Sequence, residues 1–160
     1  MADLIVLGFD SKATADEVFR LARDLQRQEL VDLADGALAW RDENGRVRID
    51  QAINATGRGV AAGALWGTLL GAIFLVPVVG LAAGATSGAI AGRLTDIGIN
   101  DKLVKEISQT LEPGKAAVFA LVRKSTPDRI RAALQQYRPI VLQTSLTTDR
   151  PEELVRALQG

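Results

Sequence analysis

The order of apolar and polar positions predicts strands alternating with helices over most of this chain. The first such segment, LIVLGF at residues 4–9, is a continuous apolar run typical of a strand buried on both faces. From Ala15 to Leu25, apolar residues recur at helical spacing. We therefore expect a helix to follow the first strand, with Ser11 or Thr14 as its N-cap.

A β-hairpin is predicted around the Asn44-Gly45 dipeptide, which lies between two alternating segments. This dipeptide favours a two-residue turn in which both central residues have positive φ. With these residues at the tip, Trp40 would lie opposite Ile49. One face of the hairpin would then carry Leu38, Trp40, Val47 and Ile49, and the other Arg41, Arg46 and Arg48.

The alternation resumes in the last third of the chain. Helices are expected over residues 100–111, 125–137 and 148–160, and strands over 116–124 and 139–146. Asn100 or Asp101 is expected to cap the first of these helices. Thr126 is suited to an N-cap and Pro127 to a first helical position. Helices alternating with strands around one antiparallel hairpin predict an α+β fold, a ferredoxin-like sandwich built from residues 1–50 and 96–160.

Residues 51–95 interrupt this pattern with a long apolar stretch. No charged residue occurs between Arg58 and Arg93. Two sets of glycines at four-residue spacing, one on each side of Pro77, are Gly59, Gly63, Gly67 and Gly71, then Gly80, Gly84, Gly88 and Gly92. Because an α-helix has 3.6 residues per turn, each set would form a groove along one helix face.

Such glycine rows are expected only where helix backbones approach closely. Glycine costs about 1 kcal/mol per helical position relative to alanine, and small-residue faces are how helices associate in lipid. Pro77 cannot lie inside an unbroken helix, so it predicts a bend between two antiparallel helices over about 57–75 and 80–95. Residues 51–95 are thus expected to form an inserted glycine-zipper helical hairpin, with its glycines as helix-packing and oligomerisation residues.

The sequence leaves the surroundings of this hairpin open between lipid and protein. The uncharged length meets the criterion for a spanning helix, but each arm of about 16 residues reaches only about 24 Å, against about 30 Å of hydrocarbon. The tip, residues 73–81, is the most apolar part of the chain. Trp66 lies in the middle of an arm, away from the interface positions of aromatic belts, and so favours a protein-packed setting.

Composition argues against catalysis. The chain contains no histidine and no cysteine, which removes the commonest general base, thiol chemistry and the commonest metal ligands. Asp42 and Glu43 adjoin the predicted turn, and Asp96 and Asp101 are expected to be turn and cap residues rather than cation ligands. We therefore predict no enzyme activity, no metal site and no cofactor.

Charge likewise gives no indication of a nucleic-acid partner. The 19 basic and 19 acidic residues balance, so no overall field attracts nucleic acid. A small basic group is formed by Arg123, Lys124, Arg129 and Arg131, without aromatic residues beside it to stack on bases. The acidic residue near the start and the short first apolar run do not form a secretory signal, which predicts a cytoplasmic start.

Several segments together resemble a known family. They are LIVLGFDSKATADEV, WRDENGRVRIDQ, the double glycine row, TDIGIND at residues 95–101 and LEPGKAAVF at residues 111–119. This combination is similar to a bacterial family catalogued as predicted membrane proteins of unknown function, and the resemblance covers almost the whole chain. It implies membrane association, and it implies no reaction and no catalytic residues.

Three functions are compatible with these patterns. The first is a self-associating structural protein at a membrane, with Arg58 and Arg93 placing the α/β domain in the cytoplasm by the positive-inside tendency. The second is a cytoplasmic soluble homo-oligomer with the apolar hairpins buried inside. A pore is the third and weakest, because Thr68, Thr86 and Ser87 are too few polar side chains to line a wetted path.

Overall fold

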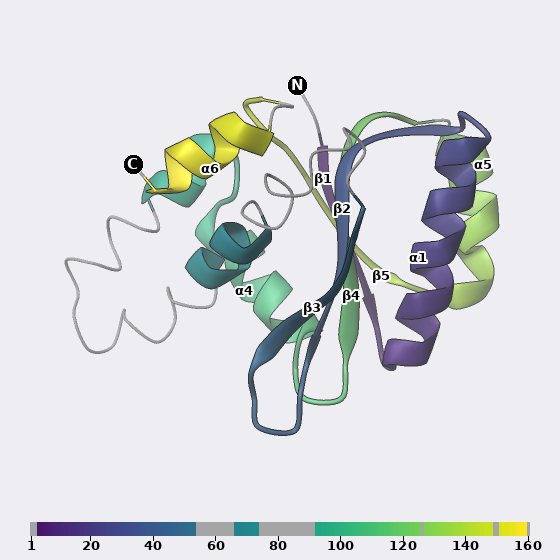
Figure 1. Ribbon diagram of the computed structural model, residues 1–160, viewed down its shortest axis with the longest axis horizontal. Coiled ribbons are helices and arrows are strands. Elements are labelled where there is room, and N and C mark those ends of the chain that lie inside the picture. Colours follow the sequence, from purple (N-terminus) through teal and green to yellow (C-terminus); the bar gives the residue numbers. More distant parts are fainter. Residues whose placement is uncertain (1–2, 54–65, 74–91, 126, 149–150, 160) are drawn as a thin grey trace.

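The computed structural model describes residues 3–53, 66–73, 92–125, 127–148 and 151–159. Within these residues the chain is a mixed α and β protein built on a five-stranded antiparallel sheet. Figure 1 shows α1 and α5 against one face of this sheet, with α4 and α6 beyond the other. The sheet is therefore the middle of three layers.

The order of the five strands in the sheet differs from their order in the sequence. The strands are β1 (Asp3–Phe9), β2 (Val31–Arg41), β3 (Val47–Ile53), β4 (Ala116–Ser125) and β5 (Ile140–Ser145). Their order across the sheet is β3-β2-β4-β1-β5, which places β4 at the centre and β3 and β5 at the edges. Only β2 and β3 are consecutive in both orders. The predicted buried strand at residues 4–9 is β1, which is enclosed between β4 and β5.

The first face of the sheet is covered by α1 (Lys12–Arg27), α5 (Pro127–Leu134) and the short 3₁₀ helix η1 (Gln135–Tyr137). Ser11 is the N-cap of α1, and its side chain accepts a hydrogen bond from the Thr14 backbone N–H at 3.2 Å. The apolar stripe of α1 meets the sheet, with Val18 and Phe19 fully buried. Helical periodicity therefore identified the inner face of α1 correctly.

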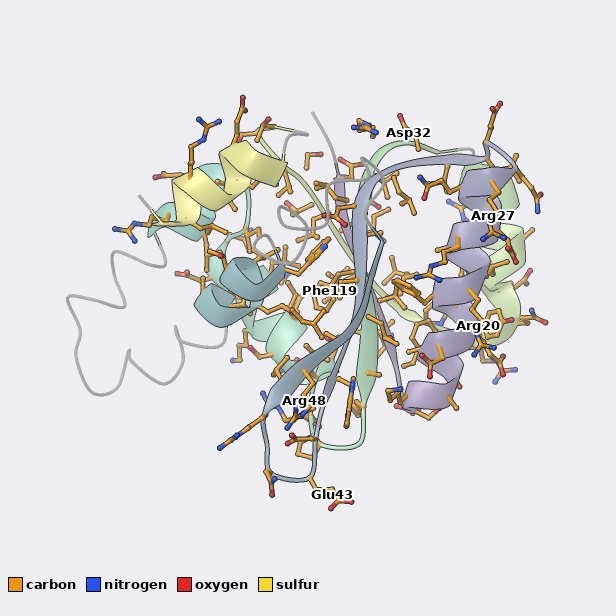
Figure 2. All side chains as sticks on the ribbon, viewed as in Figure 1. Arg20, Arg27, Asp32, Glu43, Arg48 and Phe119 are labelled. Carbon is orange, nitrogen blue, oxygen red and sulfur yellow. The ribbon has the colours of Figure 1, made fainter. Side chains whose placement is uncertain are left out.

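The second face holds the larger core. It is covered by α4 (Asp101–Thr110), α6 (Pro151–Gln159) and two further helical segments, residues 66–73 and 92–97. Asn100 caps α4, because its side-chain oxygen accepts the Leu103 backbone N–H at 2.8 Å. Phe119 on the central strand β4 is fully buried in this core, and Figure 2 shows it on the side of the sheet that faces these helices.

The β2–β3 hairpin differs from the prediction in turn type and in register. Asp42 and Arg46 close a three-residue loop, and of its residues only Gly45 has positive φ, at 80°. Such a loop is a type I turn followed by a left-handed residue, which adds one residue to the predicted turn. Trp40 consequently lies opposite Arg48, and Ala39 lies opposite Ile49.

This shift of one residue changes which side chains share a face. Trp40 packs with Leu38 on the α1 side of the sheet, whereas Val47 packs against the core on the other side. The predicted apolar face of Leu38, Trp40, Val47 and Ile49 is therefore wrong, because side chains alternate strictly along a strand. Ile49 is partly exposed instead, at 38%.

Asp42 explains the longer turn. Its carboxylate accepts hydrogen bonds from the backbone N–H groups of Asn44 at 3.0 Å and Arg46 at 2.9 Å, and from Nε of Arg48 at 2.8 Å. The Arg48 hydrogen bond is the largest cause that lowers the pKa of Asp42, followed by the bond from Arg46. Figure 2 shows Glu43 at this tip, below both helical layers, with Arg48 higher on the hairpin.

Candidate helix-packing site

Residues 66–73 are the described part of the first predicted hairpin arm, and they are helical. Their two faces have opposite surroundings. Trp66, Leu69, Leu70 and Ile73 are buried in the core on the second face of the sheet. Gly67 and Gly71 lie on the exposed side. The two faces of this helix therefore differ in side-chain size: bulky apolar residues face the core, and glycines face outward.

Trp66 joins this helix to the sheet. Its ring centroid lies 6.0 Å from that of Phe119, and the two ring planes are inclined at 54°, a favourable tilted arrangement. Only 1% of Trp66 is exposed. The protein-packed setting that its mid-arm position favoured is thus confirmed for this residue.

The three described glycines of the predicted rows have no described neighbour at their side-chain positions. A Cβ added to Gly67, Gly71 or Gly92 would meet no atom of the described residues within 4 Å. Gly59, Gly63, Gly80, Gly84 and Gly88 lie outside the described residues, as does the predicted bend at Pro77. Packing of these glycines against another helix stays a prediction.

A buried carboxyl group lies in the same core as Trp66. Asp35, near the middle of β2, is 2% exposed and lies opposite Leu121 of β4. Its Oδ1 accepts the Gly36 backbone N–H at 2.8 Å. Burial raises the pKa of Asp35, and the hydrogen bond from Gly36 and the Trp66 indole offset this effect only in part. The Trp66 indole Nε1–H favours the charged form, yet it meets no acceptor within hydrogen-bond geometry among the described residues.

The sequence prediction did not find Asp35. Its Asp-Gly pair is the kind of dipeptide that marks turns, and no role was predicted for Asp35. In the structure β2 already begins at Val31, and its pairing with β4 is irregular on both sides of Leu33. The alternation of buried Val31 and Leu33 with exposed Asp32 was the signal that could have extended the strand.

The other candidate residues do not come together into a site. Asp96 and Asp101 are exposed, and the described residues contain no group of three or more acidic side chains that could hold a metal ion. Within the predicted basic group, Arg123 pairs with Asp32 at 3.0 Å and Arg131 is exposed. The side chains of Lys124 and Arg129 lie outside the described set.

Comparison with protein families places the chain. Residues 60–159 match DUF1269, described as a protein of unknown function. The chain belongs to the DUF1269 family. Neither the curated proteins nor the solved structures gave a match. Among the described helices, none combines the length and the hydropathy of a membrane span.

The DUF1269 match covers residues 60–159, whereas the resemblance was expected to cover almost the whole chain. The matched residues leave out β1, β2 and β3. The match includes β4 and β5, which do not pair with each other, because β1 lies between them. It also includes helix 66–73, whose buried residues share a core with Leu4 and Val6 of β1. The matched segment therefore depends on strands that precede it in the chain.

The buried Asp35 predicts a specific pH dependence of stability. Because its folded-state pKa lies above the ordinary value of 3.8, the folded chain binds this proton more tightly than the unfolded chain. The contribution of Asp35 to the free energy of unfolding is greatest below pH 3.8. This contribution falls as the pH rises from 3.8 towards the raised pKa of the folded state. We expect Asp35→Asn to remove this fall, measured by urea unfolding at several pH values.

Asp42→Asn is the matched control with the opposite sign. The lowered pKa of Asp42 means that its contribution is present above 3.8 and is lost as pH falls towards the lowered value. Asp42→Asn should therefore reduce stability at neutral pH and have little effect in acid. Parallel pH profiles for Asp35→Asn and the unsubstituted protein would contradict the assignment of the buried charge.

Proposed function

We propose that this protein is a non-enzymatic, self-associating structural protein that associates with a membrane through its glycine-rich stretch. The observation that carries the proposal is the position of Gly67 and Gly71. They lie on the exposed side of a helix whose other side is anchored by Trp66 and Ile73 in the core. Held in this way, the glycine side is available to a helix of another copy.

The energetics of glycine support this proposal. Each glycine in an exposed helix costs about 1 kcal/mol relative to alanine. No atom of the described residues lies within 4 Å of a Cβ added at position 67 or 71, so steric crowding by that part of the chain does not require glycine there. Close approach of a second helix is a physical reason for keeping both positions without a side chain.

The arrangement of strands supports the finer proposal of a ferredoxin-like α/β domain. Without the edge strand β3, the order is β2-β4-β1-β5, and α1 and α5 connect strands that have one other strand between them. This is the split β-α-β pattern of ferredoxin-like folds. Within this proposal, residues 1–50 and 96–160 form the domain, and residues 51–95 form the insertion that carries the glycines.

Two other functions remain as alternatives. A soluble homo-oligomer with the apolar stretch in its interior would use the same glycine faces, and the burial of Trp66 in protein favours it. A pore is the weaker alternative, because Thr68, Thr86 and Ser87 are the only polar side chains of residues 60–91. The membrane proposal places the α/β domain in the cytoplasm, with no cofactor and no nucleic acid as partner.

The glycine face is tested by the double substitution Gly67→Leu and Gly71→Leu. Among the described residues, no atom lies close to a Cβ added at either position, so the monomer is expected to keep its fold with leucine there. Helix-to-helix contact would be blocked, and we expect self-association to weaken by at least about tenfold, or 1.4 kcal/mol. Light scattering and sedimentation over a concentration series measure this change.

Thr68→Leu is the control, because it places the same leucine side chain on the same helix beside the glycine row. Gly67→Ala and Gly71→Ala give a second contrast: alanine favours the helix by about 1 kcal/mol per position but still hinders close approach. If the leucine variant keeps its native mass and the concentration dependence of the original, the glycine face is not the contact.

Fractionation of the untagged protein from its own cells separates the lipid and soluble alternatives. Recovery only from carbonate-washed membranes, after detergent, would support the membrane proposal. A large detergent-free soluble species would instead favour the assembly with a buried apolar interior. The leucine variant should weaken the association made through the glycine face in either case, so this test is independent of the previous one.

A further inference from the structure

The edge strand β5 has an open half that the proposed glycine contact does not use. Ile140 and Val141 are 54% and 56% exposed, and they are the two most exposed large apolar residues of the described chain. Both belong to β5, which among the described strands pairs with β1 alone. An edge strand presents unpaired backbone N–H and C=O groups, so its natural partner is another strand.

The other half of β5 is already occupied. The Thr144 hydroxyl donates to the Gly98 carbonyl at 2.7 Å, and the Thr147 backbone N–H donates to the Ile97 carbonyl at 3.2 Å. Gly98 also lies so close to the Ser145 carbonyl that an added Cβ would clash with its oxygen. A partner strand can therefore reach only the first residues of β5, up to about Gln143.

The two edges of the sheet differ in charge. The strand β3 carries Arg48 and Asp50 and begins directly after Arg46. The segment from Pro139 to Thr148 contains no charged residue. Charged side chains on an edge discourage pairing with another strand. Of the two edges, β5 is thus the one without this protection.

We propose that β5 pairs with β5 of a second copy, antiparallel and about a two-fold axis at Val141. A two-fold axis perpendicular to the sheet keeps each side chain on its own face. Val141 then lies opposite Val141 of the second copy, and Ile140 lies opposite the second copy's Leu142. The paired sheets of two chains would form one continuous sheet.

A second copy fits this edge better than a strand of another kind. A two-fold contact places identical residues opposite or near one another, and like charges directly opposite are destabilising. An edge that pairs with itself should therefore be uncharged, as residues 139–148 are. With the axis at Val141, the paired residues run from Pro139 to Gln143 in both copies, and none of them is charged.

Single-cysteine variants test this pairing directly, because the chain has no cysteine of its own. Opposite residues in an antiparallel pair have Cα atoms about 4.5–5.5 Å apart, within the range that a disulfide spans. We expect Val141→Cys in the full chain to form a cross-linked dimer under mild oxidation. Two control variants are Ile49→Cys on the β3 edge and Gln143→Cys, two residues further along β5. Each should cross-link at a rate at least roughly tenfold lower than that of Val141→Cys.

The β5 contact is independent of the proposed contact through the glycine face. A variant with substitutions at both surfaces distinguishes the two contacts. In the Gly67→Leu, Gly71→Leu background, the protein should still form dimers through β5. Adding Val141→Lys places two ammonium groups opposite each other and should leave monomers, whereas adding Ile49→Lys should leave the dimer intact. Sedimentation in buffer, or in detergent if the protein requires it, measures the mass, and circular dichroism checks that each variant folds.

Three results would overturn the proposal. One is equal cross-linking of the three cysteine variants. Another is a dimer that survives Val141→Lys. The third is a loss of association with Ile49→Lys, which would show that β5 meets β3 of the next copy in an open-ended chain. A glycine variant that stays fully associated contradicts the glycine face and leaves the cysteine test of β5 unaffected.

Discussion

A fragment of residues 54–160, produced without the first 53 residues, is expected not to fold. It retains the whole DUF1269 match but lacks β1, β2 and β3. Its two strands cannot form a sheet on native pairings, since β4 pairs only with β1 and β2, and β5 pairs only with β1. We expect weak helical circular dichroism and no cooperative transition in urea.

Reconstitution is the control for this fragment. Addition of residues 1–53 as a separate peptide supplies the missing strands, because the division follows the end of β3 at Ile53. A cooperative transition should then return in proportion to the peptide added, up to saturation. If the fragment alone unfolds at the same urea concentration as the full chain, the dependence of β4 and β5 on β1 is wrong.

Replacement of Trp66 by alanine is expected to lower the free energy of unfolding by about 3–5 kcal/mol. The indole is 1% exposed and packs against Phe119, so alanine leaves a cavity that the sheet cannot fill. The same substitution loosens helix 66–73 from the core that it shares with α4 and α6. Urea unfolding followed by circular dichroism gives the difference directly.

Trp66→Phe is the matched variant. It keeps an aromatic ring beside Phe119 and removes an indole N–H that has no hydrogen-bond partner in the described structure. Its cost should therefore be clearly smaller than that of Trp66→Ala. If helix 66–73 belonged to a separable hairpin, Trp66→Ala would leave the main unfolding transition unchanged, which would falsify the shared core.

Local sequence signals predicted most of the elements outside the glycine-rich stretch, because the physics that specifies them is local. Ser11 and Asn100 cap the helices that they were expected to cap, and Pro127 is the first residue of α5. Each of these roles depends on residues within one helical turn. The apolar face of α1 was readable for the same reason, since its period is a property of the helix itself.

The length of the β2–β3 turn could not be predicted from the local sequence alone. Asn44-Gly45 correctly marked the turn, but two turn types that differ by one residue in length both accept glycine at position 45. The choice between them depends on the Asp42 carboxylate, which binds the Asn44 and Arg46 backbone and Arg48 across the turn. One residue of difference moved Val47 to the opposite side of the sheet from Trp40.

The sequence by itself determined the kinds of elements, their order and the two helix caps, because helix and strand periods and capping residues act over a few neighbours. It also drew attention to the glycine rows. Only the tertiary structure decided that Trp66 belongs to the core of the sheet, that Asp35 is buried beside it, and that Gly67 and Gly71 are left outside. These outcomes depend on which strands become neighbours, and that order, β3-β2-β4-β1-β5, is set by packing between residues distant in the chain.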